Sequence, residues 1–457
     1  MIKKLSNKNK ITDPRIMALQ VLNIFDQKLI SIDPIISDFE QDIKNIPKID
    51  RSFFNALVYG ILRWRKSLDW IIENNSKRSI KKIDKPVLNI IRIGLFQIFF
   101  MDKVPDYAAI DTSVNMAKQI SLSRSKGFIN GILRNIVRNK KDILFRLPEN
   151  CDANIIANFK SFPVWLIKKW INALGKQQTI DLCDFLNQIP SITIRVNTEK
   201  ISIENLHNIL LNYVKSIQRL KYSPLALSIT GPQQPISEIP EFKKGLFHIQ
   251  DEASQIITYI LNPQPGEKIL DACAGKGGKT GHIAQIMNNN GTIIAVDKSE
   301  KKLDMLLLEM KKSGFTNVKT QKISWPDSNY KDVFDKILID CPCSGLGVIR
   351  RNPDTKWLRF KKDFIKYKNE QIKILSAMTH LLKKGGTLVY CVCSCEPEET
   401  TEVIKNFLSN NDKFKLIKNL YWLPESIKKI INKNGYFISW PHLYNMDGFF
   451  AACLIKE

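Results

Sequence analysis

The sequence predicts an α/β protein in which a doubly wound parallel sheet follows an all-helical region and a small α+β region. Apolar residues recur at every third or fourth position through the first third of the chain, which is the spacing of amphipathic helices. In the second half, strand-like apolar runs alternate with helix-like runs, as they do in parallel sheets. These patterns predict three domains, at residues 1–145, 146–235 and 236–457.

Residues 1–145 are predicted to be helical throughout. Asp13 and Pro14 mark the first helix start, because aspartate caps helix N-termini and proline is tolerated at the first helical position. The expected helices cover residues 16–25, 54–68, 86–101, 108–120 and 128–137. Between Thr112 and Lys141 the chain carries seven basic residues and no acidic one. This basic face is either a solvated surface or a surface that binds phosphate groups.

Residues 146–235 combine both patterns, with a helix expected at 163–186, a strand at 191–198 and a helix at 203–211. No residue pattern in this region indicates chemistry.

Residues 236–457 then alternate between the two element types. The expected strands are 268–271, 292–297, 333–340, 387–393 and 448–454, and the expected helices are 280–287, 301–312 and 364–382. Because ligands of doubly wound sheets bind beyond the carboxyl ends of the strands, the residues there are the functional candidates.

The composition narrows the classes of protein that fit. The apolar and charged fractions, 44% and 25%, exclude collagen-like and disordered chains, while 69 basic against 45 acidic residues give a net charge of +24. That charge favours a polyanionic partner, although a general lysine bias is the alternative. The apolar run at 90–101 is too short to cross a membrane, and no export signal precedes it. Nine cysteines, clustered late, indicate a reducing cytoplasm rather than a disulfide framework.

The first strand end is followed by a glycine-rich turn that allows three interpretations. It consists of Asp271, Ala272, Cys273, Ala274, Gly275, Lys276, Gly277, Gly278, Lys279 and Thr280. A phosphate-binding P-loop would need glycine where Cys273 stands. A dinucleotide-binding turn would need its third glycine where Thr280 stands. The third interpretation is the first loop of a domain that binds a nucleoside cofactor for methyl transfer.

Asp297, at the second strand end, discriminates among these interpretations. It follows Gly275 by about 20 residues, the spacing at which an acid holds the ribose hydroxyls of a nucleotide. A P-loop has no need of such a residue. The alternative role for Asp297 is to cap the helix that follows it.

The next two strand ends carry five cysteines and an aspartate: Asp340, Cys341, Cys343, Cys391, Cys393 and Cys395. A metal site is not expected, because Cys-x-Cys spacing places alternate cysteines on opposite sides of a strand and no histidine is close in sequence. Thiol chemistry needs an electropositive, partly exposed cysteine. The basic loop at 350–357, with Arg350 and Arg351, is expected to supply that field.

The motifs DxCAxxGGKT, DxPCS, YxxCSxxPEE and DGFF, in this order, resemble those of the RNA cytosine-C5 methyltransferases. The helical N-terminal region resembles the NusB-like RNA-binding domain. The pairing is similar to the bacterial 16S (small-subunit) rRNA methyltransferases of the Sun/Fmu/RsmB type, and the resemblance covers essentially the whole chain. It implies a Rossmann-like class I methyltransferase domain, joined by a small α+β linker domain to an all-α NusB-like domain.

The resemblance also implies a chemistry. Cys393 would attack C6 of the cytosine, Asp340 would stabilise the protonated ring nitrogen, and Cys343 would assist release. S-adenosylmethionine would bind against Asp271, Cys273, Ala274, Gly275, Lys276, Gly277, Gly278, Lys279, Asp297 and Asp340. The phosphates of small-subunit rRNA, free or partly assembled, would bind to Arg350, Arg351, Lys118, Arg134 and Arg138. Cys341, Cys391 and Cys395 match no family cysteine and are expected to be packing residues.

Two departures from the family pattern are present. Gly275 and Lys276 replace an Ala-Pro pair, and residues 318–326, near the third strand's end, lack the family's acid, for which Asp327 is the nearest substitute. Three alternatives remain open: the same chemistry on tRNA, a non-catalytic RNA-binding assembly factor, and a P-loop ATPase.

Overall fold

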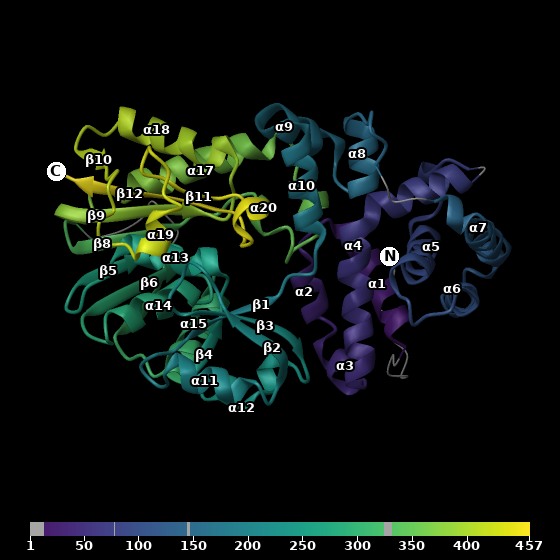
Figure 1. Ribbon diagram of the computed structural model, residues 1–457, viewed down its shortest axis with the longest axis horizontal. Helices are drawn as coiled ribbons and strands as arrows, with labels where there is room; N and C mark the ends of the chain where they lie inside the picture. The colour runs from purple at the N-terminus through teal and green to yellow at the C-terminus, as the bar shows by residue number, and fades with distance from the viewer. Residues whose placement is uncertain (1–12, 77, 144–146, 324–330) are drawn as a thin grey trace. The chain divides into compact units, whose positions relative to one another are not determined.

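A computed structural model describes residues 13–76, 78–143, 147–323 and 331–457, and it divides the chain into two compact units (Figure 1). The first unit contains the described residues up to Asn187 together with Asn352–Arg359. The second contains the described residues of Gln188–Arg351 and Phe360–Glu457. The predicted three-domain division stays a prediction, but its middle region contributes helices to the first unit and strands to the second. Among the described residues, no helix is both long and apolar enough to cross a membrane.

The first unit is helical, as predicted. Its α-helices are α1 (Pro14–Lys28), α2 (Ile32–Ser37), α3 (Glu40–Asn45), α4 (Lys48–Asn75), α5 (Lys85–Phe100), α6 (Asp106–Gln119), α7 (Lys126–Arg138), α8 (Ala153–Lys160), α9 (Val164–Leu174), α10 (Lys176–Asn187) and α16 (Thr355–Leu358). Asp13 caps α1 as expected, accepting a 2.8 Å hydrogen bond from the backbone N–H of Arg15. The helix predicted at 163–186 is interrupted at Gly175, where the backbone takes a φ of 83°.

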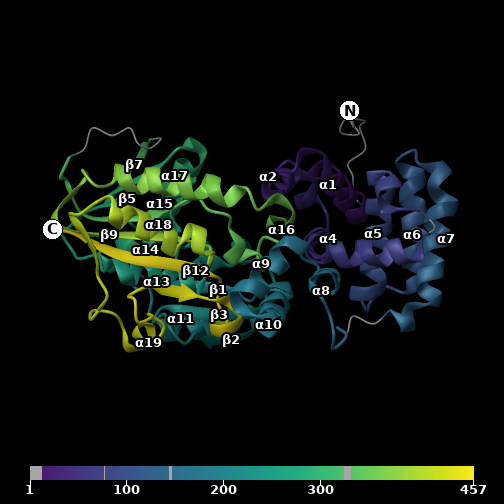
Figure 2. The ribbon, with the colours of Figure 1, turned by 90° about the horizontal axis from the view of Figure 1, so that it is seen from above.

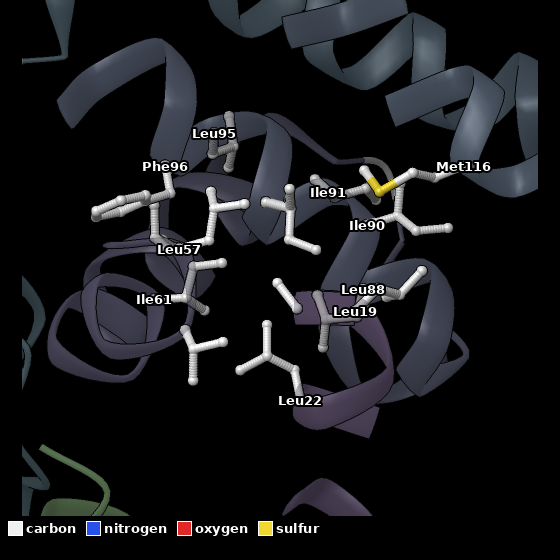
Figure 3. Close-up of a cluster of buried hydrophobic side chains, with 14 of the residues drawn as sticks. Leu19, Leu22, Leu57, Ile61, Leu88, Ile90, Ile91, Leu95, Phe96 and Met116 are labelled. Atoms are coloured by element: carbon white, nitrogen blue, oxygen red, sulfur yellow. The ribbon is translucent and has the colours of Figure 1, made fainter. Parts of the chain in front are cut away.

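The core of this unit forms where apolar faces of several helices meet. Figure 3 shows Leu22 of α1, Ile61 of α4 and Leu88 of α5 pointing into one cluster, with Met116 of α6 at its edge. All four side chains are buried. The three- and four-residue spacing seen in the sequence therefore marks the face of each helix that is buried in the core.

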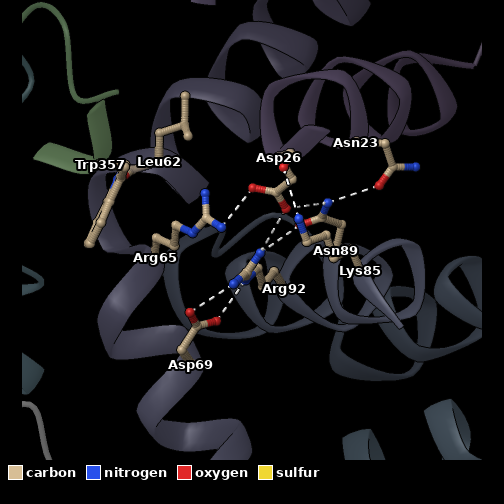
Figure 4. Close-up of polar contacts among 9 residues, drawn as sticks. All are labelled: Asn23, Asp26, Leu62, Arg65, Asp69, Lys85, Asn89, Arg92 and Trp357. Carbon is tan, nitrogen blue, oxygen red and sulfur yellow. Dashed lines mark hydrogen bonds and ion pairs between the residues drawn. The ribbon is translucent and has the colours of Figure 1, made fainter. Parts of the chain in front are cut away.

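Buried and half-buried charges cross-link the same helices (Figure 4). Asp26 of α1 lies 2.7 Å from the guanidinium of Arg65 and 3.4 Å from that of Arg92, which in turn lies 2.7 Å from Asp69. Because an unpaired buried charge is strongly destabilising, arrangements of α1, α4 and α5 that leave Asp26 or Arg92 without a partner are disfavoured. Trp357 also belongs to this unit, and its indole N–H donates a 2.7 Å hydrogen bond to the carbonyl of Leu62.

The second unit contains two sheets. The smaller is antiparallel, in the order β2-β3-β1-β4, and consists of β1 (Ile192–Val196), β2 (Val214–Arg219), β3 (Ala226–Pro232) and β4 (Phe247–Ile249), with α11 (Ile203–Leu210) and α12 (Pro240–Lys243). The strand β1 and the helix α11 were predicted. The other three strands were not, because only the first has an uninterrupted alternating pattern.

The larger sheet has the order β10-β12-β9-β8-β5-β6-β7, with β11 paired to β12. Its strands are β5 (Lys268–Asp271), β6 (Thr292–Asp297), β7 (Val318–Lys322), β8 (Phe334–Asp340), β9 (Leu382–Val392), β10 (Phe414–Leu416), β11 (Phe437–Ser439) and β12 (Phe449–Lys456). The strands β5, β6, β8 and β9 run parallel as predicted, and β7, which was not predicted, continues the parallel order beside β6. The expectation of a wholly parallel sheet is wrong at one edge, because β12 returns antiparallel to β9 and pairs with β10 and β11.

Helices cover both faces of this sheet (Figure 2). They are α13 (Glu252–Leu261), α14 (Gly278–Ile286) and α15 (Glu300–Ser313) on one face, and α17 (Asp363–Ala377) and α18 (Thr401–Ser409) on the other. Two short helices, α19 (Glu425–Lys428) and α20 (Pro441–Tyr444), precede the last two strands. Successive strand residues alternate between the two faces, so that Ile269 packs with the first set and Leu270 with the second.

Candidate active site at the strand ends

The strand order places the predicted site residues together. Since β9, β8, β5 and β6 are neighbours and parallel, Asp271, Asp297 and Asp340 end adjacent strands, and Cys393 directly follows β9. A cavity of about 370 Å³ opens at this edge. Of the residues predicted to bind cofactor or RNA, it is lined by Asp271, Cys273, Ala274, Gly275, Lys276, Gly278, Lys279, Asp340 and Arg351.

The glycine-rich turn between β5 and α14 forms one wall of the cavity. Gly275 and Gly277 have φ values of 58° and 87°, in the left-handed region that side chains disfavour. A Cβ atom on Gly277 would lie 2.6 Å from Leu306, whereas one on Gly275 would meet nothing within 4 Å. The backbone of Gly275 is therefore open to a ligand, while Gly277 allows the turn to pack against α15.

Asp297 binds the turn directly. One carboxylate oxygen accepts a 3.1 Å hydrogen bond from the N–H of Gly275, and the other accepts a 2.8 Å bond from that of Ser299. Ser299 occupies the N-cap position of α15, so Asp297 is not the cap of that helix. Asp297 thus connects the end of β6 to the cavity wall, and the ribose role stays a prediction.

Asp271 offers a free acceptor at the base of the cavity. Its Oδ2 accepts a 2.7 Å hydrogen bond from the hydroxyl of Thr280, but its Oδ1 is buried and has no hydrogen-bond partner among the described residues. Burial raises the pKa of this carboxyl to about 7. A ligand that brings a hydrogen-bond donor would satisfy the unpaired oxygen.

Lys279 and Asp340 form an ion pair across the cavity, with Nζ 2.6 Å from Oδ2. Burial alone would lower the pKa of Lys279, but the neighbouring Asp340 carboxylate outweighs it and raises that pKa. The other oxygen of Asp340 lies 3.6 Å from the sulfur of Cys391. This lysine is therefore bound to a carboxylate, unlike the lysine that a P-loop presents to phosphate.

Two thiols face each other beside this pair. The sulfurs of Cys343 and Cys393 are 3.3 Å apart, and both side chains are half-buried. The hydrogen bond with Cys393, aided by burial, raises the pKa of Cys343, so Cys343 keeps its proton at neutral pH. Cys341, Cys391 and Cys395 are buried, as expected of packing residues. Within the described ranges, no group of three potential ligands could hold a metal ion.

A buried carboxylate fixes the two cysteine loops to each other. Glu399 accepts a 2.6 Å hydrogen bond from the N–H of Ser344, a 2.6 Å bond from its hydroxyl and a 2.7 Å bond from the hydroxyl of Ser394. Each serine directly follows one of the facing cysteines. Gln371 of α17 adds a 2.9 Å bond to the carbonyl of Pro342. We call Glu399, Ser344 and Ser394 the serine–glutamate clamp.

The loop after Cys343 also packs closely on the start of β12. The N–H of Gly347 donates to the carbonyl of Cys393 at 3.0 Å, and the N–H of Gly448 donates to the carbonyl of Gly347 at 2.8 Å. A Cβ on Gly347 would lie 1.9 Å from the carbonyl oxygen of Gly448. Only glycine permits this approach.

The two predicted phosphate-binding arginines contact carboxylates. Arg351 lies 2.6 Å from Asp447 and 2.7 Å from Asp251, and Arg350 lies 3.7 Å from Asp447. Burial, followed by the nearby Asp251, raises the pKa of Asp447 to about 7. Arg350 is buried, and Arg351 is half-buried and paired with two carboxylates. The phosphate-binding role of both arginines stays a prediction.

Lys356 was expected to contribute to the positive field around the cysteines. It lies instead in the first unit, where its ammonium group donates hydrogen bonds to the carbonyls of Arg63 and Ser161 and to Asn187. Burial lowers its pKa. The prediction for Lys356 was therefore wrong, because it was based on the proximity of Arg350 and Arg351 in sequence.

The remaining predicted residues lie at exposed positions. Lys118 is on α6, and Arg134 and Arg138 are on α7. Lys322 ends β7, and its ammonium lies 3.2 Å from Glu300. Asp327, the suggested substitute for the family's acid, lies outside the described residues.

Sequence reasoning assigned no role to the clamp, to Asp251 or to the pairing of Lys279 with Asp340. The available signal was the serine after each facing cysteine and the acidic pair that follows the second cysteine. The hydroxyls of Ser344 and Ser394 share a buried acceptor only because the fold brings the two cysteine loops together, and the sequence alone does not show this.

Comparison with known proteins gives a consistent picture. Residues 258–455 match the family 16S rRNA methyltransferase RsmB/F, residues 12–138 match the NusB family, and residues 162–236 match an RsmF/B-like methyltransferase ferredoxin-like domain. A probable ribosomal RNA small subunit methyltransferase B of Synechocystis is 33% identical over 413 residues, covering 89% of this chain and 91% of the relative.

The Escherichia coli ribosomal RNA small subunit methyltransferase B is 32% identical over 446 residues, covering 97% of this chain and 98% of that protein. The solved structure of NSun6 from Pyrococcus horikoshii with SFG is 25% identical, with a TM-score of 0.57, and covers 65% of this chain and 99% of that one. The matched regions follow the predicted order of helical, small α+β and doubly wound parts.

Proposed function

Because this chain belongs to the ribosomal RNA small subunit methyltransferase B family, a family of S-adenosylmethionine-dependent enzymes, we propose that it methylates C5 of a cytosine in small-subunit rRNA through a covalent adduct with Cys393. The observation that carries this proposal is the pair of facing thiols. Their 3.3 Å separation, at the ends of adjacent strands and beside Asp340, provides a nucleophile, a second thiol and a carboxylate within one site.

The residues of the cavity fit S-adenosylmethionine. The unpaired oxygen of Asp271 can accept a hydrogen bond from the cofactor's amino group, and the open backbone of Gly275 permits close approach. Asp297, which already binds the N–H of Gly275, lies at the next strand end, where ribose hydroxyls are recognised. When bound, S-adenosylmethionine supplies an electrophilic methyl group.

Cytosine C5 is a poor nucleophile and has to be activated. The Cys393 thiolate would add to C6, and the electron pair of the C5–C6 double bond would move onto C5. C5 would then be nucleophilic toward the methyl group that S-adenosylmethionine would supply, with S-adenosylhomocysteine as the leaving group. The positive charge of Lys279 lies close enough to interact with Cys393. Asp340, held by Lys279 at 2.6 Å, accepts a hydrogen bond from the protonated ring nitrogen.

Release reverses the addition. The C5 proton leaves to solvent, its electron pair restores the double bond, and the bond between C6 and the Cys393 sulfur breaks. Cys343 keeps its proton and donates a hydrogen bond to the departing Cys393 thiolate. The serine–glutamate clamp positions both sulfurs for these steps.

The target cytosine has to be unstacked to reach the cavity, which favours an RNA loop or bulge over a continuous duplex. Basic residues of α6 and α7, including Lys118, Arg134 and Arg138, would hold the phosphates. The charge of +24 supports a polyanionic substrate of this kind.

The experiment that tests the substrate is nucleoside analysis. Unmodified small-subunit rRNA, alone and in partly assembled subunits, and unmodified tRNA are each incubated with the protein and S-adenosylmethionine. We expect 5-methylcytidine in the rRNA and none in the tRNA. Modification of tRNA alone would overturn the substrate assignment, whereas RNA binding without methylation would indicate an assembly factor.

A further inference from the structure

A second cavity, of about 570 Å³, lies between α6 and α7 of the first unit. From α6, Ile110, Val114 and Lys118 line it at helical spacing, so they share one face of that helix. From α7, Lys126, Asn130 and Arg134 line it in the same way. Its volume falls in the range of roughly 300–1,000 Å³ that is typical of small-ligand sites.

The charge of this cavity is mostly positive. Lys118, Lys126 and Arg134 project from its two walls, against a single carboxylate, Asp111. Asp111 already accepts a 3.0 Å hydrogen bond from Asn115. Lysine and arginine together provide a point charge and a planar fork, both of which suit phosphate oxygens.

An exposed aromatic ring lies at the N-terminal end of α6, which forms one wall of this cavity. Tyr107, on the first turn of α6, lines the cavity and is 77% exposed. Ile110 and Val114, both half-buried, provide an apolar surface beside it. An exposed aromatic ring next to cations is the arrangement by which proteins stack the bases of single-stranded RNA.

Two glycines leave the α7 wall open. A Cβ on Gly127, which lines the cavity, or on Gly131, one turn later, would meet nothing within 4 Å. Glycine inside a helix costs about 1 kcal/mol relative to alanine, so tight packing does not explain these residues. A ligand can instead approach the first turn of this 13-residue helix, whose N-cap Ser125 makes no side-chain capping bond.

We propose that this α6/α7 cavity binds one unpaired nucleotide of the substrate RNA, with the base on Tyr107 and the phosphates on Lys118, Lys126 and Arg134. The inference rests on the proposed function for the identity of the RNA. It adds a specific site for single-stranded RNA, remote in sequence from the cysteines. Because stacking is tolerant of sequence, the site selects unpaired RNA and not a particular base.

The test measures the affinity of the full chain for a short oligouridylate and for an RNA duplex of the same length. Tyr107→Ala should weaken oligouridylate binding by about 5- to 150-fold, since stacking on one ring contributes roughly 1–3 kcal/mol. Tyr107→Phe should retain native affinity, because it keeps the ring. Arg134→Ala should reduce the slope of log affinity against log salt by about 1.

Tyr421→Ala and Lys81→Ala are matched controls, since Tyr421 is 74% exposed in the second unit and Lys81 is exposed elsewhere in the first. Neither should change oligouridylate affinity. Native affinity in Tyr107→Ala, with an unchanged melting temperature, would overturn the proposal, and so would an equal loss for the duplex. If Tyr107→Ala loses affinity while the native chain transfers no methyl group, the cavity stands and the proposed function fails.

Discussion

Replacing Glu399 is the sharpest test of how the two thiols are held. Its carboxylate, which is fully buried, accepts three hydrogen bonds of 2.6–2.7 Å from Ser344 and Ser394. Glu399→Gln keeps the volume and one carbonyl acceptor, and its amide can donate to a serine hydroxyl. Glu399→Ala removes every acceptor.

The magnitudes follow from these bonds. A buried donor left without a partner costs about 1–3 kcal/mol, so Glu399→Ala should lower the free energy of unfolding by about 3–5 kcal/mol. Glu399→Gln exchanges charge-assisted bonds for neutral ones and should cost about 1–2 kcal/mol. A displacement of about 1 Å between reacting groups reduces rates by roughly 100-fold, so we expect the glutamine variant to lose 10- to 100-fold in kcat.

The assay compares kcat and KM for methyl transfer in Glu399→Gln and in Glu402→Gln. Glu402 lies one turn along, in a partly exposed ion pair with Lys368, and its replacement should change little. We expect Glu399→Gln to lower kcat with an unchanged KM for RNA, because Glu399 does not contact substrate. Native kcat in a folded Glu399→Gln, or an effect on KM alone, would refute the positioning role.

Three further outcomes follow from the site. Cys343→Ala should trap a covalent protein–RNA adduct that migrates as a shifted band on a denaturing gel, and an absent band would contradict the division of roles between the thiols. Gly347→Ala, which brings a Cβ to 1.9 Å from the Gly448 carbonyl, should lower the free energy of unfolding by about 1–3 kcal/mol in urea titrations; an unchanged midpoint would refute the close contact. Burial raises the pKa of Asp271 to about 7, so the folded chain retains a proton that the unfolded chain loses above about pH 4, and stability falls as pH rises between these values. The Asp271→Asn variant lacks this titration. Its free energy of unfolding should therefore rise by about 3 kcal/mol relative to that of the native chain as the pH increases from 5 to 8, and a difference that does not change with pH would contradict this.

Local sequence patterns predicted the helical character of the first unit and five strands of the larger sheet, but not β7, β10 or β11. The helix start at Asp13 depends on neighbouring residues alone, and the five expected strands of the larger sheet are all present. The antiparallel return of β12 was missed because its apolar run resembles that of a buried parallel strand. The position of Lys356 in the helical unit was not predicted, because its ammonium group is held by carbonyl groups that lie 169 to 293 residues away in sequence.

The sequence predicted the site residues that lie at the ends of strands. It did not predict the contacts that form between side chains of different loops. Asp271, Asp340 and Cys393 follow from the rule that parallel strands present their carboxyl ends at one edge. The clamp by Glu399 and the pairing of Arg351 with Asp251 and Asp447 require the register between loops. Periodicity carries no information about that register.

The central claim is that Cys393 forms the bond to the cytosine. The most direct measurement is transfer of label from methyl-labelled S-adenosylmethionine to unmodified small-subunit rRNA, with the native chain and Cys393→Ala side by side. We predict label at cytosine C5 with the native chain and none with the variant, at equal RNA affinity. Label at C5 from a folded Cys393→Ala would contradict the assignment of the nucleophile.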